Sequence, residues 1–266
     1  MKNNFLRLVL FLLTTSVFAQ SNEVSIEKND KGMALIVNGK KLMINGMNWD
    51  YTPIGTSVIN YSLWKQSDDV IKAALDGEMG LLKNMGINAI RQYTGVQPKW
   101  IKYIYENYGI YTMLNHSFGR YGLTINGAWV PVTDYRDPAT QEILMSEVTQ
   151  MAEDYKNTPG VLLFLLGNEN NYGLFWAGAE TEDFPDSEEE KKFIGEKRGR
   201  PMYKLMNDAA VKMKAISSSR PVAICNGDVL FIDIIAEECK DVDIYGVNMY
   251  RGVSFGDAFQ VVKDKL

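Results

Sequence analysis

The segment 161–166 limits the possible folds more than any other part of the chain. Its sequence, Val-Leu-Leu-Phe-Leu-Leu, is apolar without alternation. A strand with one face in water alternates apolar and polar residues, whereas a parallel strand covered on both faces does not. The tetrapeptide Gly-Asn-Glu-Asn, residues 167–170, follows immediately. It is either an ordinary polar turn or the place where a parallel α/β enzyme keeps functional groups.

Strand and helix patterns alternate along the rest of the chain. The segment 75–85 has apolar residues three and four positions apart and stops at Gly86, which predicts a helix. Pro98 and the pair Asp137-Pro138 open two further helices, because proline fits the first helical turn. The predicted strands are 42–49, 87–93, 110–115, 161–166, 222–226 and 242–248, and the other predicted helices are 99–108, 137–157, 201–218 and 231–239. Six βα repeats predict a parallel α/β fold.

Two parallel architectures share this alternation, the doubly wound sheet and the TIM (β/α)8 barrel. The first predicted strand ends in Asn-Gly-Met-Asn-Trp, residues 45–49, and lacks the glycine-rich phosphate loop of many doubly wound domains. Polar or aromatic residues close almost every strand: Trp49, Asp50, Arg91, Tyr93, His116, Asn168, Glu169, Asn226, Asp228, Asn248 and Tyr250. A site built from many strand ends favours the barrel.

The chain begins with two segments that precede the predicted barrel. Residues 1–19 resemble a signal peptide, with Lys2 and Arg7, an apolar core at 8–13 and small residues near Ala19. The core is too short to span a bilayer, so export to the periplasm or the extracellular space is expected, without a membrane association after cleavage. Residues 20–41 predict a β-hairpin around the turn 29–32. Residues 42–266 then form the barrel.

Composition excludes several partners. Removal of the predicted signal peptide leaves 26 basic and 33 acidic side chains, so the concentrated basic surface that binds nucleic acid is not expected. The single histidine, His116, and the absence of clustered cysteines predict neither a transition-metal site nor a cofactor. Cys225 and Cys239 lie in different predicted elements and are interpreted as two buried free thiols.

The region from residue 42 to the end resembles the catalytic barrel of the retaining glycoside hydrolases of clan A, most nearly family 2, with family 5 as its neighbour. The most specific match is Gly167-Asn168-Glu169, and Gly-Ile-Asn-Ala-Ile-Arg at 86–91 supports it. The resemblance implies that Glu169 is the general acid/base and that Asn168 binds the substrate hydroxyl beside the cleaved bond. It also implies that Arg91 orients the nucleophile and that Tyr250 approaches the nucleophile from the other side.

The chain departs from this family pattern at its end. The family nucleophile is a Glu that closes the seventh strand, whereas only 16 residues follow Tyr250. The segment 254–266 is interpreted as the start of the sixth helix. We therefore expect a barrel that lacks strands 7 and 8, is truncated at its carboxyl end and is inactive as it stands. No Glu in the helix 231–239 or in the polar insertion 177–200 is assigned as nucleophile.

Other strand-end residues are candidates for sugar binding. His116 follows a buried strand, although a lone histidine is often structural. Aromatic rings suit the apolar faces of sugars but also pack under loops, so both interpretations stay open for Trp49, Tyr51, Tyr172 and Trp176. Asn248 closes the sixth strand beside Tyr250. The charged run 180–200 is most simply a solvated surface.

The expected function is hydrolysis of a β-linked glycoside or polysaccharide by a retaining mechanism, with a carbohydrate as the partner. A transglycosylase would use the same residues. A noncatalytic carbohydrate-binding barrel would keep the aromatic residues and dispense with the nucleophile. The sugar itself does not follow from the fold.

Overall fold

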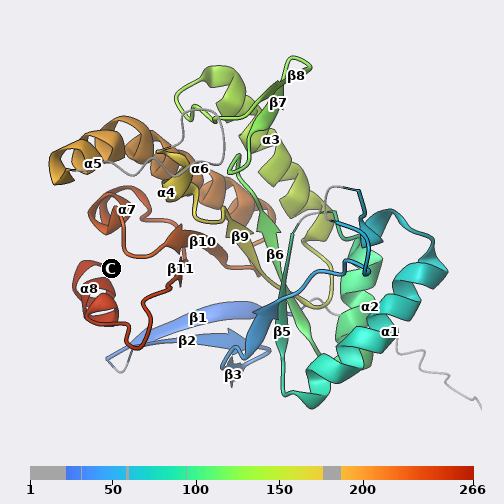
Figure 1. Cartoon of the computed structure of the whole chain (residues 1–266). Coiled ribbons are helices and arrows are strands. Elements are labelled where there is room, and N and C mark those ends of the chain that lie inside the picture. Colours follow the sequence, from blue (N-terminus) through green and yellow to red (C-terminus); the bar gives the residue numbers. More distant parts are fainter. Residues whose placement is uncertain (1–21, 31, 58–59, 94, 176–186) are drawn as a thin grey trace, which may run out of the picture.

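Six parallel strands form the central sheet of the computed structural model, which describes residues 22–30, 32–57, 60–93, 95–175 and 187–266 (Figure 1). The predicted signal peptide and Trp176 lie outside these residues. The order across the sheet is β11-β10-β9-β6-β5-β4. The strands are β4 (Gly46–Asn48), β5 (Ala89–Tyr93), β6 (Tyr111–His116), β9 (Val161–Leu166), β10 (Val222–Gly227) and β11 (Ile244–Asn248).

The strand order distinguishes the two architectures that the sequence leaves open. Each strand pairs in parallel with the next parallel strand along the chain, and the order never reverses. A doubly wound sheet reverses its order at the crevice where it binds ligand, so it does not fit. The predicted (β/α) barrel is confirmed, with six consecutive strands in the described residues and with β4 and β11 at the two edges of the sheet.

Helices follow the strands on the outside of the sheet. Those that follow the six parallel strands in turn are α1 (Asp68–Asn84), α2 (Pro98–Tyr108), α3 (Pro138–Tyr155), α6 (Arg200–Ile216), α7 (Ile232–Glu238) and α8 (Ala258–Lys265). The short ones are η1 (Leu63–Lys65), α4 (Asn170–Gly173), α5 (Glu188–Ile194) and the π-helix η2 (Gly195–Gly199). Asp137 caps α3 by accepting from the backbone N–H of Thr140 at 2.8 Å, and Gly109 ends α2 at φ 70°. No described helix has the length and apolarity that crossing a membrane requires.

Several elements differ from the sequence-based prediction. The predicted strand 42–49 is divided, because Leu42 belongs to the N-terminal sheet and only Gly46–Asn48 joins the barrel. Helix α1 starts at Asp68 rather than 75, since acidic residues in its first turn suit the helix dipole. A hairpin, β7 (Leu123–Ile125) and β8 (Ala128–Val130), was not predicted. Its turn is Asn126-Gly127, with φ 51° and 79°, as a type I′ turn requires.

The predicted N-terminal hairpin is confirmed and gains a third strand. Strands β1 (Val24–Asn29), β2 (Gly32–Val37) and β3 (Lys40–Leu42) form an antiparallel sheet, which lies below the amino ends of the barrel strands in Figure 1. Val24 and Val37 pack against Ala89 and Leu162, at the starts of β5 and β9. This sheet therefore covers the end of the barrel opposite the carboxyl ends of the strands.

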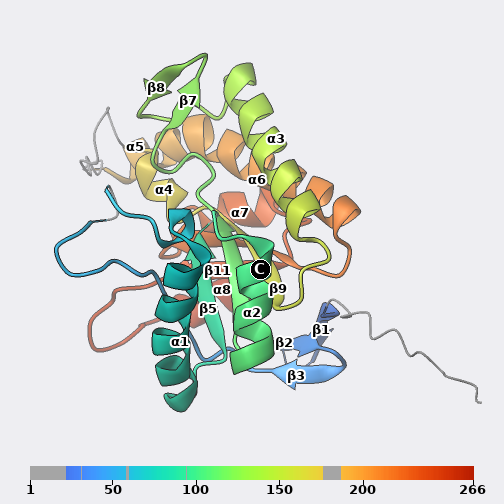
Figure 2. The same cartoon turned by 90° about the vertical axis from the view of Figure 1, so that its right-hand side faces the viewer.

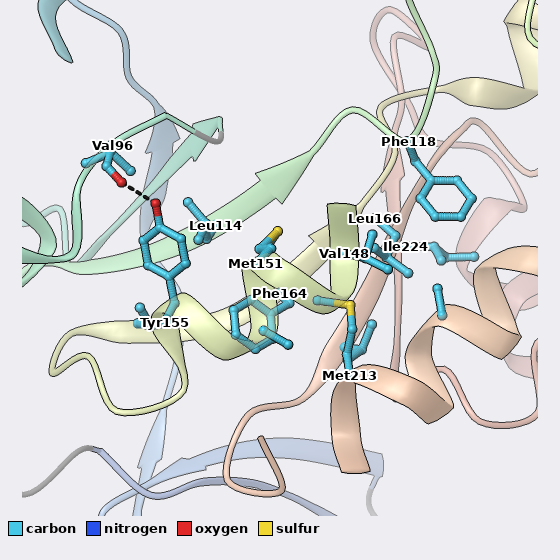
Figure 3. Packing of buried hydrophobic residues seen from close by; sticks show 14 of the residues in the cluster. Val96, Leu114, Phe118, Val148, Met151, Tyr155, Phe164, Leu166, Met213 and Ile224 are labelled. Carbon is cyan, nitrogen blue, oxygen red and sulfur yellow. Dashed lines mark hydrogen bonds between the residues drawn. The ribbon is translucent and has the colours of Figure 1, made fainter. Parts of the chain in front are cut away.

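Strand β9 is buried along its whole length, as its unbroken apolar sequence predicts. Phe164 and Leu166 belong to the large outer core, which also contains apolar residues of α3 and α6 (Figure 3). Leu163 and Leu165 face the other way and pack with Ala223 on β10. The inner cluster consists of strand residues, as in the interior of a barrel.

Candidate active site

Strand periodicity brings three polar side chains to the inner face of the sheet. Arg91 on β5, Asn115 on β6 and Asn248 on β11 occupy the register positions that alternate with the outward-facing core residues Ile90 and Leu114. All three lie at or near the carboxyl ends of their strands. This is the end of a (β/α) barrel at which active sites are built.

Arg91 connects two neighbouring strands to the loop after β9. Its Nε donates to Asn115 Oδ1 at 2.6 Å, and its Nη2 donates to Asn168 Oδ1 at 2.9 Å. Asn115 in turn donates from Nδ2 to the carbonyl of Gly167 at 3.1 Å. Because Arg91 is buried, the planar guanidinium and both asparagines are held in one arrangement.

Glu169 stands in the centre of this polar group. Its backbone has φ 56° and ψ 38°, a left-handed conformation that is uncommon for a residue with a side chain and recurs at functional sites. The N–H of Glu169 donates to the carbonyl of Cys225 at 2.8 Å, which ties the residue to β10. Asn248 Nδ2 donates to Glu169 Oε1 at 2.8 Å and lies 3.3 Å from Asn168 Oδ1. The carboxyl group is thus positioned from three different strand ends.

Two further asparagines fix the short helix that follows Glu169. Asn170 accepts from the N–H of Asn168 at 2.8 Å and donates to the carbonyl of Phe118 at 2.8 Å. Asn171 binds both backbone groups of Gly227: its Oδ1 accepts from the N–H at 2.8 Å, and its Nδ2 donates to the carbonyl at 2.9 Å. Gly167 must lack a side chain, because a Cβ there would lie 2.6 Å from Asn170 Oδ1. The segment Gly-Asn-Glu-Asn-Asn is therefore a turn whose conformation is fixed by side-chain hydrogen bonds, and not a solvated loop.

Two tyrosines and one cysteine border the same group. Tyr121, in the loop after β6, accepts from Asn168 Nδ2 at 3.0 Å. Burial, together with the neighbouring Tyr121, raises the pKa of Tyr93, whose ring lies 5.5 Å from the Arg91 guanidinium carbon. Burial raises the pKa of the Cys225 thiol, Arg91 opposes that shift and the Glu169 carboxylate adds to it. The Tyr93 hydroxyl and the Cys225 thiol are therefore neutral at physiological pH.

The structure does not bring every predicted site residue into this group. His116 is directed outward, where its Nε2 lies 3.2 Å from Glu147 on α3 and its Nδ1 accepts from the N–H of Phe118 at 3.1 Å. Strand β6 ends at His116, so its inward position is Asn115 instead. Trp49 is only 7% exposed and packs in the outer core against Trp64. Neither ring borders Glu169, because both face the helices.

The remaining aromatic candidates lie around the rim. Tyr172 on α4 packs against Gly227, where a Cβ would lie 2.3 Å from the ring. Tyr250 is 89% exposed just after β11. Its neighbour Arg251 forms a two-point ion pair with Asp228, at 2.5 and 2.8 Å, which joins the loops after β10 and β11. Trp176 is not among the described residues.

Four site residues were not predicted from the sequence: Asn115, Asn170, Tyr121 and Cys225. Alternation along β6 indicates that the Asn115 side chain points inward, because inward residues recur at every second position of a strand. Both cysteines are free, as predicted, although Cys239 is only partly buried. Nowhere in the described residues do three or more His, Cys, Asp or Glu side chains gather as metal ligands would.

Comparison with known proteins places this site in a family. Segments of the β-galactosidases of Alteromonas mediterranea and Lactococcus lactis are each 29% identical to this chain, over 145 and 154 residues. These segments cover 54% and 57% of this chain but only 12% and 13% of those proteins. The chain therefore spans a small part of the length of these relatives.

Solved structures share the fold. The β-glucuronidase of Parabacteroides merdae superposes with a TM-score of 0.56 at 21% identity, over 91% of this chain and 24% of that one. The β-1,4-D-mannanase of Cryptopygus antarcticus superposes with a TM-score of 0.57 at 12% identity, over 88% of this chain and 73% of that one. The model of the glycosyl hydrolases family 2 TIM barrel domain matches residues 29–254. The chain belongs to the TIM barrel domain of glycosyl hydrolase family 2.

Proposed function

We propose that this domain takes part in the hydrolysis of a β-linked glycoside or polysaccharide, with Glu169 as the general acid/base. The observation that carries the proposal is the position of the Glu169 carboxyl, at the carboxyl end of the barrel, with Asn248 donating to Oε1 at 2.8 Å. The β-galactosidase relatives and the family membership support the class of substrate.

The geometry suits protonation of a leaving group. A glycosidic oxygen leaves poorly as an alkoxide, so an acid must deliver a proton as the bond breaks. Asn248 occupies Oε1 as a donor, which directs the acidic proton to Oε2. Asn168, held by Arg91 at 2.9 Å, would donate from its amide to a sugar hydroxyl beside the cleaved bond.

Retention of configuration needs a second carboxylate, about 5–5.5 Å from the first. In the described residues, the hydrogen-bond network that joins Arg91, Asn115, Asn168, Glu169 and Asn248 includes no other Asp or Glu. We infer that the nucleophile is a carboxylate outside this network, which would lie beside Arg91. On that basis Glu169 and this network would need that second carboxylate to turn over a glycoside with retention.

Leaving-group dependence tests the role of Glu169 in a catalytically active protein that carries this domain. Glu169→Ala should slow glycosides with poor leaving groups by about 10²–10⁴-fold, since general acid catalysis contributes that much. Activated aryl glycosides need little protonation and should lose far less in the bond-breaking step. Glu147→Gln is a matched control, because it removes a carboxylate that contacts His116 on the outer side of the barrel.

Four results would contradict the proposal. Equal losses of rate in Glu169→Ala on both substrate types would contradict the role of Glu169 as the acid. Release of the inverted anomer, observed by proton NMR of the first product, would exclude retention. Binding of oligosaccharides without any turnover would instead support a noncatalytic carbohydrate-binding barrel, and sugar transfer in place of hydrolysis would indicate a transglycosylase.

We also propose that the protein is exported. The basic start, the apolar core at 8–13 and the small residues before position 20 support a cleaved signal peptide. Mass spectrometry of the protein from its native host should find an N-terminus near Gln20 or Ser21. An intact Met1 on the mature protein would refute export by this route.

A further inference from the structure

We propose that Cys225 is a positioning residue, whose thiol fixes the side-chain amide of Asn248 so that the NH2 group, and never the carbonyl oxygen, faces Glu169. The inference rests on the proposed acid/base role of Glu169. It adds a residue on β10 that touches neither the substrate nor the reacting atoms.

The contacts of Asn248 define two chemically different sides. Its Nδ2 lies 2.8 Å from Glu169 Oε1 and 3.3 Å from Asn168 Oδ1, and both of these atoms are oxygens. Its Oδ1 lies 3.4 Å from Cys225 Sγ, within hydrogen-bond distance for sulfur. In the described part of the chain, this thiol is the only protein donor that reaches Asn248 Oδ1. The thiol at the carbonyl end and the Asn168 oxygen at the NH2 end therefore both favour the orientation in which the NH2 group points to Glu169.

Cys225 is suited to act as a donor. Its side chain is buried on the inner face of β10, and burial keeps the thiol neutral by raising its pKa. A neutral thiol can donate one hydrogen bond and is a weak acceptor. Its other near oxygen, Asn168 Oδ1, is more distant at 4.0 Å and already accepts from Arg91. The thiol hydrogen is therefore directed to Asn248.

The acid/base cycle explains why the amide needs to be fixed. When Glu169 is ionised, its carboxylate itself attracts the NH2 group. When Glu169 is protonated, its O–H can donate, and an unrestrained amide could rotate and accept that proton through its carbonyl. The proton would then point at Asn248 rather than at the leaving oxygen. The thiol opposes this rotation in both states.

Other charged and titratable groups around Glu169 do not hold the amide. Arg91 on β5 is committed to Asn115 and Asn168, at 2.6 and 2.9 Å. Tyr121 accepts from Asn168, and Tyr93 lies beside it and the Arg91 guanidinium. Of the groups that border Glu169, the thiol alone contacts the carbonyl end of Asn248.

The test compares Cys225→Ala with Cys225→Ser in ¹⁵N-labelled protein that carries the whole domain. Loss of a single weak donor should lower turnover of poor-leaving-group glycosides about fivefold, because such a bond is worth about 1 kcal/mol. Cys225→Ser keeps a donor of nearly the same size and should restore most of that rate. The Asn248 side-chain NH2 should give one pair of NMR signals in the wild-type and Ser proteins, and averaged or doubled signals in the Ala variant.

Controls separate this proposal from its alternatives. Cys239→Ala removes the other thiol, which lies 3.5 Å from the carbonyl of Tyr203, and should change neither readout. If Cys225→Ala does not fold, Cys225→Val takes its place in the test, because valine also lacks the donor but fills the space of the thiol. Unchanged Asn248 signals in a donor-free variant would overturn the inference. Because the NMR readout needs no turnover, an inactive wild-type protein would refute the proposed function without deciding the role of Cys225.

Discussion

Arg91 and Asn168 are joined by a 2.9 Å hydrogen bond, although 77 residues separate them along the chain. The bond links the second barrel strand to the loop after the fourth. Since Arg91 also holds Asn115 at 2.6 Å, one buried guanidinium links β5 and β6 to the loop after β9 at the carboxyl end of the barrel. The guanidinium therefore helps to hold the turn that presents Glu169.

Arg91→Met should therefore destabilise the fold as well as the site. It leaves the buried oxygen of Asn115, and that of Asn168, without their charged donor, and a hydrogen bond to a charged group contributes about 1.5–3 kcal/mol. We expect the free energy of unfolding in urea to fall by about 3 kcal/mol. Arg136→Met, which removes an exposed pair with Asp134 at 2.8 Å, should cost less than about 1 kcal/mol. Similar losses in both variants would contradict the role of Arg91.

Gly227→Ala tests the packing between β10 and the helix after Glu169. The added Cβ would lie 2.3 Å from the ring of Tyr172, so α4 would have to move. Overpacking of this kind costs about 1–3 kcal/mol, and the shift should also reduce turnover. The control is Gly77→Ala in α1, where no atom lies within 4 Å, and it should stabilise by about 0.5–1 kcal/mol. Thermal unfolding of the two variants measures the contrast, and a neutral Gly227→Ala would show that Tyr172 moves freely.

Most of the barrel could be predicted from the sequence because its signals are local. The unbroken apolar run of β9 and the helix starts at Pro98 and Asp137 each depend on neighbouring residues only. The missed β7–β8 hairpin also had a local signal in Asn126-Gly127. The start of α1 was missed because its first turn is polar and carries little apolar periodicity.

The site was less predictable because one residue of register decides which face a side chain occupies. His116 and Asn115 are adjacent, yet His116 contacts Glu147 outside the sheet and Asn115 binds Arg91 inside it. A prediction from strand ends alone cannot separate them. The role of Cys225 depends on contacts with residues on other strands, which no local pattern contains.

Asn171→Ala should loosen the turn that carries Glu169. Its amide makes two hydrogen bonds with the backbone of Gly227; without them the N–H would be buried without a partner, and the carbonyl would keep only Asn226 Nδ2 at 3.4 Å. We expect a loss of about 2–4 kcal/mol, from two groups at about 1–2 kcal/mol each. Asn207→Ala on α6 is the control, because its bonds to Asp241, at 2.7 and 3.1 Å, are exposed. Hydrogen exchange should show faster opening at α4 in the Asn171 variant alone, and equal protection in both variants would contradict this assignment.

The pair Asp228–Arg251 should make stability depend on pH. Arg251 lowers the pKa of Asp228 in the folded protein, so the unfolded chain binds a proton more readily than the folded one. The contribution of the pair is therefore complete above the ordinary Asp pKa of about 3.9 and is lost as the pH falls through the lowered folded value. Asp228→Asn should cost about 1 kcal/mol at pH 7, and the difference from wild type should shrink as the pH falls below the ordinary Asp pKa of about 3.9.

Asp257→Asn provides the matched comparison for that titration. Asp257 contacts the same Arg251 at 3.3 Å but is 79% exposed, so solvent screens the interaction. We expect the Asp257 variant to lose less than half as much stability at pH 7 as the Asp228 variant, and to follow the wild-type pH dependence closely. Urea unfolding at half-unit steps measures both curves. If the stability of Asp228→Asn fell in parallel with wild type from pH 5 to 3, the ion pair between the β10 and β11 loops would not be a source of acid sensitivity, and the loop carrying Tyr250 would be held by other contacts.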